Sequence, residues 1–249
     1  MLMHFRSWLK SFDVVGKDED FGTVDDALID EKDLAIRYFT VKTGNWFSGE
    51  KMYISPVSIE SINVNDEVIK TDITKEDAEN APRLEGRDLM DRTYETNFNT
   101  HYGLNPYWTG PGVWGTSFTA RELAAQQPVA MPEPGEDSKG EPEIYKAKDI
   151  IRYEFSAEDD SFGQVEDLLI EEDSYKVRYF VIDTRKFFGG KKVLISADWV
   201  ENIDWIKAQI QTNVTKEQVE NSPEYLPEIP LSREMEVDLY SYYNRTPYW

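Results

Sequence analysis

The sequence predicts a mainly β protein made of two tandem small antiparallel β-barrels, each followed by short helices and a C-terminal tail. Three observations lead to this fold class. The chain contains a gapless internal repeat, each copy reads as a series of short strands joined by tight turns, and the end of each copy changes to a helical period.

The repeat is the strongest signal in the sequence. The segment that begins at Phe21 aligns without a gap with the segment that begins at Phe162, 141 residues further along. Their sequences are FGTVDDALIDEKDLAIRYFTVKTGNWFSGEKMYIS and FGQVEDLLIEEDSYKVRYFVIDTRKFFGGKKVLIS. About 25 of the 62 aligned positions from 21 to 82 are identical, and the match continues to a Pro-Tyr-Trp sequence at the end of each copy. Residue types kept in both copies therefore belong to the shared fold or a shared surface.

The strands are clearest in the second copy. Residues 164–170 follow a glycine and are rich in Val and Leu, and KVRYFVID at 176–183 carries large side chains on both faces, as expected for a small closed barrel. KFFGGKK reads as a hairpin loop and KVLIS as the returning strand. Two further short strands are expected in WVENIDWIKAQIQTNV.

Short helices are expected after each set of strands. Thr74 and Thr215 precede a side chain three residues later that can complete a capping box, and a proline ends each helix. SREMEVDLYSYYNR from Ser232 predicts a longer helix, with the weaker MDRTYETNFNTHYG in the first copy. The terminal Tyr-Trp pairs are expected to pin each tail onto its barrel.

Between the copies the sequence turns rich in Gly and Pro, which indicates a linker over residues 109–142 between modules at 1–108 and 143–249. Within this linker, TSFTARELAAQ predicts a short helix capped by Ser117 or Thr119, because Glu122 stands three residues after Thr119.

Composition narrows the function classes. The chain has 249 residues and no cysteine, which excludes disulfides, thiolate metal sites and cysteine nucleophiles. A net charge of −21 disfavours nucleic acid and anionic membranes as partners. No segment is apolar enough for a signal peptide or a membrane span, so we expect a cytoplasmic protein without membrane insertion.

The runs G-x-V-x-D-x-L-I, R-Y-F-x-[VI]-x-T and G-x-K-x-x-I-S occur in both copies and resemble the PRC-barrel family over about residues 13–72 and 154–213. This fold is known from the cytoplasmic domain of the photosynthetic reaction-centre H subunit and from ribosome-maturation factors. The resemblance implies a small β-barrel used for protein interaction or assembly. No proton-path residue can be matched, and the membrane helix of the H subunit has no counterpart in this sequence.

Two sets of repeated residues are candidates for specific roles. Arg37 and Arg178 lie within apolar strands and, if buried, need carboxylate partners, for which the matched Asp26 and Asp167 on the neighbouring strand are expected. A ligand-binding role for the arginines is the alternative. The loop aromatics form a candidate interaction surface or else fold over the barrel end: Trp46, Phe47, Phe187 and Phe188.

The acidic turns recur in register and are candidate cation ligands through Asp18, Glu19, Asp159 and Asp160. However, Asp also favours turns for conformational reasons, and the spacing is not that of an EF-hand. The two histidines, His4 and His101, do not form part of a recognisable catalytic or metal motif, and Tyr242 replaces His101 in the second copy. A packed tail residue is the expected role of His101.

The sequence therefore predicts a non-catalytic interaction or assembly module without a cofactor. Its partner is an unidentified protein. The candidates are a second copy of the chain and a membrane complex with which the chain associates peripherally. The alternative is a protein that binds a small ligand or a divalent cation at the acidic turns.

Overall fold

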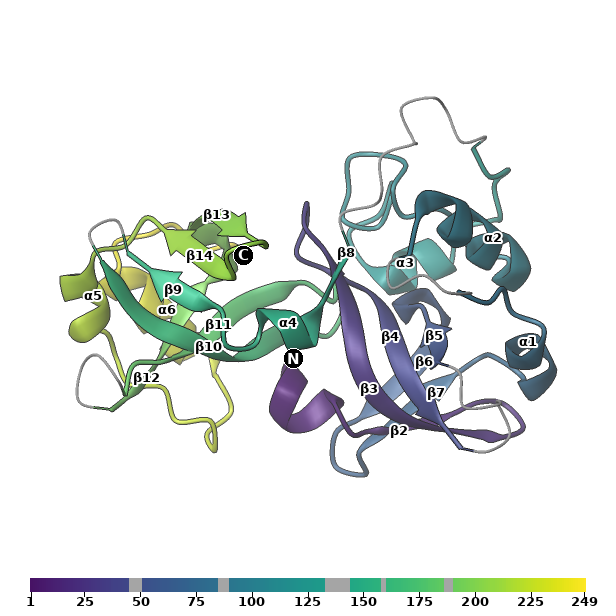
Figure 1. Cartoon of the computed structure of the whole chain (residues 1–249), viewed down its shortest axis with the longest axis horizontal. Coiled ribbons are helices and arrows are strands. Elements are labelled where there is room, and N and C mark those ends of the chain that lie inside the picture. The colour runs from purple at the N-terminus through teal and green to yellow at the C-terminus, as the bar shows by residue number, and fades with distance from the viewer. Residues whose placement is uncertain (45–50, 85–89, 133–143, 158–159, 186–189) are drawn as a thin grey trace. The chain divides into compact units, whose positions relative to one another are not determined.

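The computed structural model describes residues 1–44, 51–84, 90–132, 144–157, 160–185 and 190–249. The chain folds into two compact units, and neither is one continuous stretch (Figure 1). The first-copy unit contains Trp8–Ala147 and Glu172–Lys176, and the second-copy unit contains Met1–Ser7, Lys148–Glu171 and Val177–Trp249. These bounds differ from the predicted modules at 1–108 and 143–249, because residues 109–142, the predicted linker, fall within the first-copy unit and the second-copy unit includes Met1–Ser7.

Each unit contains one seven-stranded sheet in its described part. The sheet of the first-copy unit has the order β5-β4-β3-β2-β7-β6, with β8 paired to β3. Its strands are β2 (Asp13–Val15), β3 (Asp20–Asp30), β4 (Ile36–Thr43), β5 (Lys51–Ile54), β6 (Ile59–Asn63), β7 (Val68–Thr71) and β8 (Ile144–Lys146).

The sheet of the second-copy unit repeats this order as β12-β11-β10-β9-β14-β13, with β1 paired to β10. Its strands are β1 (Leu2–His4), β9 (Glu154–Ser156), β10 (Ser161–Glu171), β11 (Val177–Asp183), β12 (Lys192–Ser196), β13 (Val200–Asp204) and β14 (Gln209–Thr212). The strands expected in the second copy are thus present, and KVLIS is the whole of β12.

The expectation of purely antiparallel, closed barrels is corrected in two respects. β2 pairs with β7 in parallel, as does β9 with β14. Among the described residues no ladder joins the two end strands of either sheet, so each sheet is mixed and open along its pairing path. Alternating side chains define the faces of a strand, but they specify neither its neighbour nor its direction.

The leading strand of each copy completes the sheet formed mainly by the other copy. β1, from the start of the chain, lies antiparallel to β10 with Met3 opposite Ile170. β8, from the start of the second copy, lies antiparallel to β3 with Tyr145 opposite Ile29. The duplicated halves are therefore interlocked by a reciprocal exchange of strands, which the sequence did not predict.

The core explains why the strands are apolar on both faces. In β11, Tyr179, Phe180, Val181 and Ile182 are all at most 1% exposed. One face of such a strand packs inside the curved sheet, while the other is covered by helices and the tail. Helices α1, α2 and α3 lie on one side of their sheet in Figure 1.

The helices begin where the sequence predicts. Thr74, Thr119 and Thr215 each form a complete capping box, which confirms the predicted starts of α1 (Lys75–Glu79), α3 (Ala120–Ala124) and α5 (Lys216–Glu220). The longer helices α2 (Arg92–Tyr102) and α6 (Arg233–Tyr242) are capped by Asp91 and Ser232. A single turn, α4 (Ala147–Ile150), follows β8.

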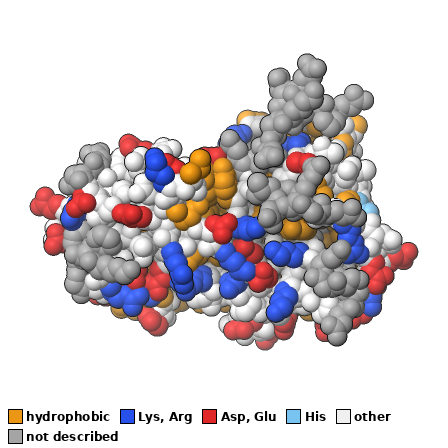
Figure 2. Space-filling view, in the orientation of Figure 1, with side chains coloured by type: hydrophobic (Ala, Val, Ile, Leu, Met, Phe, Trp, Pro, Cys, Tyr) orange, Lys and Arg blue, Asp and Glu red, His pale blue; other side chains and the backbone are white. Residues whose placement is uncertain are grey.

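No helix in the described residues is both long and apolar enough to cross a bilayer. On the face shown in Figure 2, Lys and Arg side chains are interspersed among the Asp and Glu side chains, so the excess negative charge does not form one continuous acidic surface there.

Candidate functional site

A buried carboxylate joins the tail to the sheet in the first-copy unit. Glu95 on α2 is 0% exposed, and its Oε1 accepts hydrogen bonds from the hydroxyls of Tyr38 on β4 at 3.0 Å and Tyr107 in the tail at 2.6 Å. Nη1 of Arg92 lies 2.7 Å from Oε2, a close ion pair outside hydrogen-bond geometry. Arg92 also lies 4.3 Å from the ring centre of Trp108.

The same arrangement recurs 141 residues later. Glu236 Oε1 accepts from Tyr179 at 2.7 Å and from Tyr248 at 2.9 Å, and its Oε2 lies 3.0 Å from Nη1 of Arg233. Arg233 in turn lies 4.0 Å from the ring centre of Trp249. We call the two sets the tail clusters: Arg37, Tyr38, Arg92, Glu95, Tyr107 and Trp108, and Arg178, Tyr179, Arg233, Glu236, Tyr248 and Trp249.

Local structure explains how these residues meet. Arg92 and Glu95 are three residues apart on α2, so both lie on one face of the helix. Tyr38 projects from a strand that is buried on both faces. The chain then returns after α2, and Tyr107 reaches the same carboxylate. This confirms the prediction that the Pro-Tyr-Trp tail is pinned back onto the strands.

The repeated arginines do not pair with the expected aspartates. Arg37 donates to Asp30 at 3.0 Å and to Asp33 at 2.9 Å, and Arg178 donates to Glu171 at 2.6 Å. The pairings Arg37–Asp26 and Arg178–Asp167 were therefore wrong, although the need for a carboxylate partner was right.

The register explains this correction. Asp26 lies opposite Thr40 on β4, three residues beyond Arg37. Leu28 and Ile29 pair with Tyr38 and Ile36, so Arg37 is the extra residue of a bulge on β4, next to the end of β3 where Asp30 lies. The sequence places the two strands side by side but does not locate the bulge.

The guanidinium groups of the repeated arginines also lie over the tail tyrosines. Arg37 lies 4.1 Å from the ring centre of Tyr107, and Arg178 lies 4.2 Å from that of Tyr248. Cation–π contacts of this kind are worth about 0.5–2 kcal/mol depending on desolvation. In both copies, the tail is thus held through the hydroxyl and the ring of its tyrosine, Tyr107 or Tyr248.

Burial dominates the electrostatics of the first tail cluster. It raises the pKa of Glu95, although Arg92 and the hydroxyls of Tyr107 and Tyr38 oppose this shift. Burial and the Glu95 carboxylate raise the pKa of Tyr38 well above its ordinary value. In the second cluster, burial together with Glu236 raises the pKa of Tyr248 to about 12. The tyrosines therefore remain donors at neutral pH, and the arrangement serves to hold the tail.

Asp167 has a different role from the predicted ion pair. It is 4% exposed and accepts hydrogen bonds from the backbone of Arg6 at 2.7 Å, from the Ser7 hydroxyl at 2.6 Å and from Nδ1 of His4 at 3.1 Å. Nε2 of His4 is 2.8 Å from the Tyr225 hydroxyl. Burial would raise the pKa of Asp167, but these hydrogen bonds together hold it below its ordinary value. Asp167 thus fixes the exchanged strand β1 in place.

The acidic turns are engaged by the helices that follow each sheet. Asp18 accepts from the backbone N–H of Lys75 at 2.8 Å, and Glu19 lies 3.3 Å from the ammonium of the same lysine. Asp160 pairs with Lys216 at 2.6 Å, while Asp159 lies outside the described residues. Within the described ranges, no group of three or more His, Asp and Glu side chains is arranged to hold a metal ion.

The loop aromatics Trp46, Phe47, Phe187 and Phe188 lie outside the described residues, so their expected role as an interaction surface stays a prediction. His101 is exposed, and its Nε2 lies 2.7 Å from the carbonyl oxygen of Asp77 while its ring contacts Tyr102.

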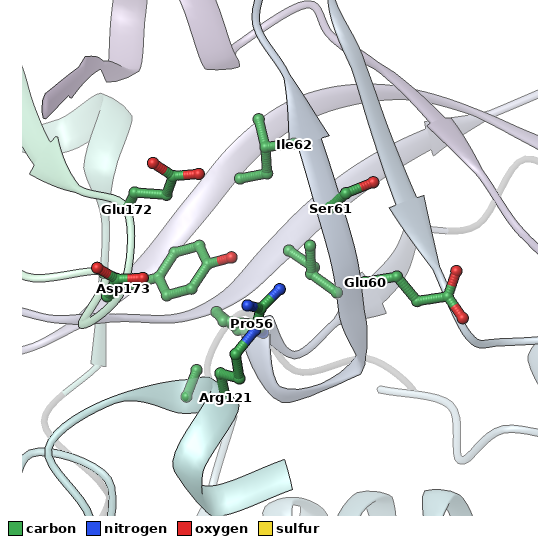
Figure 3. A pocket seen from close by; sticks show the side chains of 10 residues that line it. Pro56, Glu60, Ser61, Ile62, Arg121, Glu172 and Asp173 are labelled. Carbon is green, nitrogen blue, oxygen red and sulfur yellow. The ribbon is translucent and has the colours of Figure 1, made fainter. Parts of the chain in front are cut away.

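A shallow pocket of about 100 Å³ lies within the first-copy unit. Figure 3 shows the Arg121 side chain beside Pro56, with Glu172 and Asp173 across the pocket. The Tyr175 ring also lines it, and burial raises the pKa of this tyrosine. Small-molecule sites are usually about 300–1,000 Å³, so this pocket is too small for most organic ligands.

Sequence reasoning missed the tail clusters and the His4–Asp167 contact. The tail clusters could have been found from the sequence, because the same residue type recurs 141 positions later for each of four members: Arg92, Glu95, Tyr107 and Trp108. The contact of His4 with Asp167 left no such signal, since it joins residues 163 positions apart and Tyr145 takes the place of His4 in the second copy.

Comparison with protein families matches the PRC-barrel domain to residues 1–78 and 142–219. These ranges include both exchanged strands and stop before the helices α2 and α6 and the Pro-Tyr-Trp segments of the tail clusters. A comparison with curated proteins gives no match.

Proposed function

Because the chain belongs to the PRC-barrel domain family, we propose that it is a non-catalytic module for protein interaction or assembly, related by fold to the reaction-centre H subunit. Its partner is a protein, either a second copy of the chain or a membrane complex with which the chain associates peripherally. We further propose a cytoplasmic location, in line with the absence of cysteine.

The reciprocal exchange of leading strands carries this proposal. β10 accepts β1 along Leu169, Ile170 and Glu171, and β3 accepts β8 in the same way. A sheet that takes up a strand from a distant part of the sequence can take up the same strand from another molecule, since main-chain hydrogen bonds supply most of the affinity. The fold therefore provides two strand-accepting edges.

The contacts of the acidic turns support this function over the alternative of cation binding. Lys75 and Lys216 already lie beside the carboxylates of Glu19 and Asp160. A cation would have to displace these ammonium groups, and the remaining carboxylate oxygens are fewer than the six to eight that calcium prefers. The volume of the pocket at Arg121 likewise disfavours an organic ligand.

Strand acceptance is tested by opening the β10 edge in the full-length chain. Met3 is 0% exposed, so Met3→Asp places an unpaired charge in the core and should release β1. A labelled peptide with the sequence of residues 1–9 should then bind the variant at least about tenfold more tightly than the native chain, whose edge is occupied. Ile206→Asp, at a residue 98% exposed, is the matched control.

Two further measurements keep this test decisive. Near-UV circular dichroism reports whether the Met3→Asp chain remains folded. Hydrogen exchange on the native chain should show the amides of β1 exchanging faster than those of β11, as expected for a strand that detaches locally. A folded variant that does not bind the peptide, or equal exchange rates in β1 and β11, would refute strand acceptance.

A further inference from the structure

The two tail clusters differ in how much of each is exposed. The Arg37 side chain is 1% exposed and that of its counterpart Arg178 is 16% exposed. The Arg92 side chain is 21% exposed, whereas that of Arg233 is 54% exposed. Trp249 is also 47% exposed. Within the part of the chain that the structure describes, the second cluster therefore repeats the internal contacts of the first but is less covered.

The cover of the first cluster is the segment that directly follows its Tyr-Trp pair. Nη1 of Arg37 donates to the carbonyl of Val113 at 2.6 Å, and the guanidinium lies 4.8 Å from the ring centre of Trp114, which is 0% exposed. Trp114 also meets the Tyr107 ring edge-on at 6.1 Å. We call residues 109–117 the cover segment.

The cover segment reaches the arginine because it folds into a narrow turn. The backbone of Trp114 pairs with that of Ser117 inside this turn. Gly115 has a φ of +69°, and a Cβ at Gly112 would lie 2.2 Å from the Ser117 oxygen. The glycines on either side of Trp114 therefore allow the backbone to approach closely enough to present both a carbonyl and an indole to Arg37.

Among the described residues, none fills the matching position in the second-copy unit. Nη2 of Arg178 donates to Glu171, and no residue within the described ranges accepts from its Nη1. The tyrosine platform beneath the guanidinium is nonetheless kept, with Arg178 4.2 Å from the ring centre of Tyr248. An arginine positioned over an aromatic ring with a free donor is a common anchor at protein interfaces.

We propose that the surface formed by Arg178, Arg233, Tyr248 and Trp249 binds a partner polypeptide in the way that the first cluster binds the cover segment. The occupant is a glycine-flanked tryptophan in a tight turn. Its backbone carbonyl accepts from Nη1 of Arg178, and its indole lies over the guanidinium and against Tyr248. This inference rests on the proposed interaction function and specifies the chemistry of one partner.

The partner should bind this surface reversibly, because the surface repeats only some of the contacts that Trp114 makes in the first-copy unit. Its indole N–H donates to the carbonyl of Ser174 at 2.8 Å, and its ring meets Tyr175 at 6.3 Å. Both residues lie in the segment Glu172–Lys176, which belongs to the first-copy unit. A partner at Arg178 gains the arginine and tyrosine contacts and lacks these two, which lowers its affinity relative to the built-in cover.

The test uses a fluorescent peptide with the sequence of the cover segment, titrated with the full-length chain up to about 1 mM. The native chain should bind it, and Arg178→Met should weaken binding at least about tenfold, because methionine keeps part of the stem and removes the donor. Arg185→Met is the matched control, since Arg185 is an exposed arginine of the same unit whose side-chain hydrogen bonds within the described residues go to Asp183. A peptide carrying Trp114→Ala should not bind.

A second measurement covers the case in which Arg178→Met unfolds or the peptide binds too weakly. The cover segment appended after Trp249 of the native chain should raise the melting temperature, whereas the same extension with Trp114→Ala should not. Peptide binding that is equal in the native chain and in a folded Arg178→Met chain would overturn the proposal, as would an appended segment without effect. Binding of the residue 1–9 peptide to Met3→Asp would still support strand acceptance, so the two failures are distinguishable.

Discussion

Tyr107→Phe offers the sharpest test of the tail clusters, because it removes one hydroxyl and keeps the ring. Tyr107 is 8% exposed, and its hydroxyl donates to the fully buried Glu95 at 2.6 Å. A hydrogen bond to a charged group contributes about 1.5–3 kcal/mol. We therefore expect this loss from the free energy of unfolding, which corresponds to roughly 3–12 °C in melting temperature for a chain of this length.

The duplication supplies a matched control in the same molecule. Tyr248→Phe removes the equivalent bond to Glu236, which is longer at 2.9 Å and belongs to a less buried cluster. We expect a loss of about 0.5–1.5 kcal/mol, near that of an ordinary hydrogen bond. Urea unfolding and calorimetry of both variants would give these free energies and show which transition belongs to which unit.

The pH dependence provides an independent check on the role of Glu95. Since its pKa is raised in the folded chain, folding favours the protonated acid, and stability should fall as the pH rises from about 4.5 through the folded-state pKa. Removing the Tyr107 hydroxyl raises that pKa further, so the variant should lose more stability at pH 7 than at pH 4. An equal cost at both pH values, or a larger loss from Tyr248→Phe than from Tyr107→Phe, would refute the reasoning.

Four further outcomes are expected. Asp167→Asn should destabilise the second-copy unit by about 2–4 kcal/mol in urea unfolding, since it removes a charged acceptor that His4, Arg6, Ser7 and Leu168 contact. Because the folded pKa of Asp167 is lowered, its contribution is present above about pH 4 and lost below, and an unchanged acid limb in the variant would contradict this. Trp114→Ala should cost about 3–5 kcal/mol, seen as a lower melting temperature, and a loss below about 1 kcal/mol would show that the cover segment is not packed. Thr119→Ala should cost about 1 kcal/mol by removing the α3 capping box, measured by urea unfolding against the exposed Ala125→Ser. Calcium or magnesium should give no rise in melting temperature and no heat in calorimetric titration, because Lys216 already pairs with Asp160; a rise abolished by Asp160→Asn would restore the cation-binding alternative.

Local features of this fold were predictable because they depend on neighbouring residues. The capping boxes at Thr74, Thr119 and Thr215 follow from residue types three positions apart. The apolar strands and their turns follow in the same way, as the bounds of β12 show. The arginine partners were mispredicted because they depend on the register of β3 and β4, in which Asp26 lies opposite Thr40 and Arg37 is the extra residue of a bulge on β4. The strand sequences do not contain the packing that sets this register.

The sequence by itself determined that the chain is a duplication, that each copy is a set of short strands with a helical tail, and that the tail residues are kept in both copies. Only the tertiary structure decided which copy each leading strand completes, and that the cover segment lies on the tail cluster of the first copy. The physical reason is that repeated sequence makes the two halves equivalent as acceptors. Which acceptor a strand or segment occupies depends on the path of the connecting chain and on long-range packing.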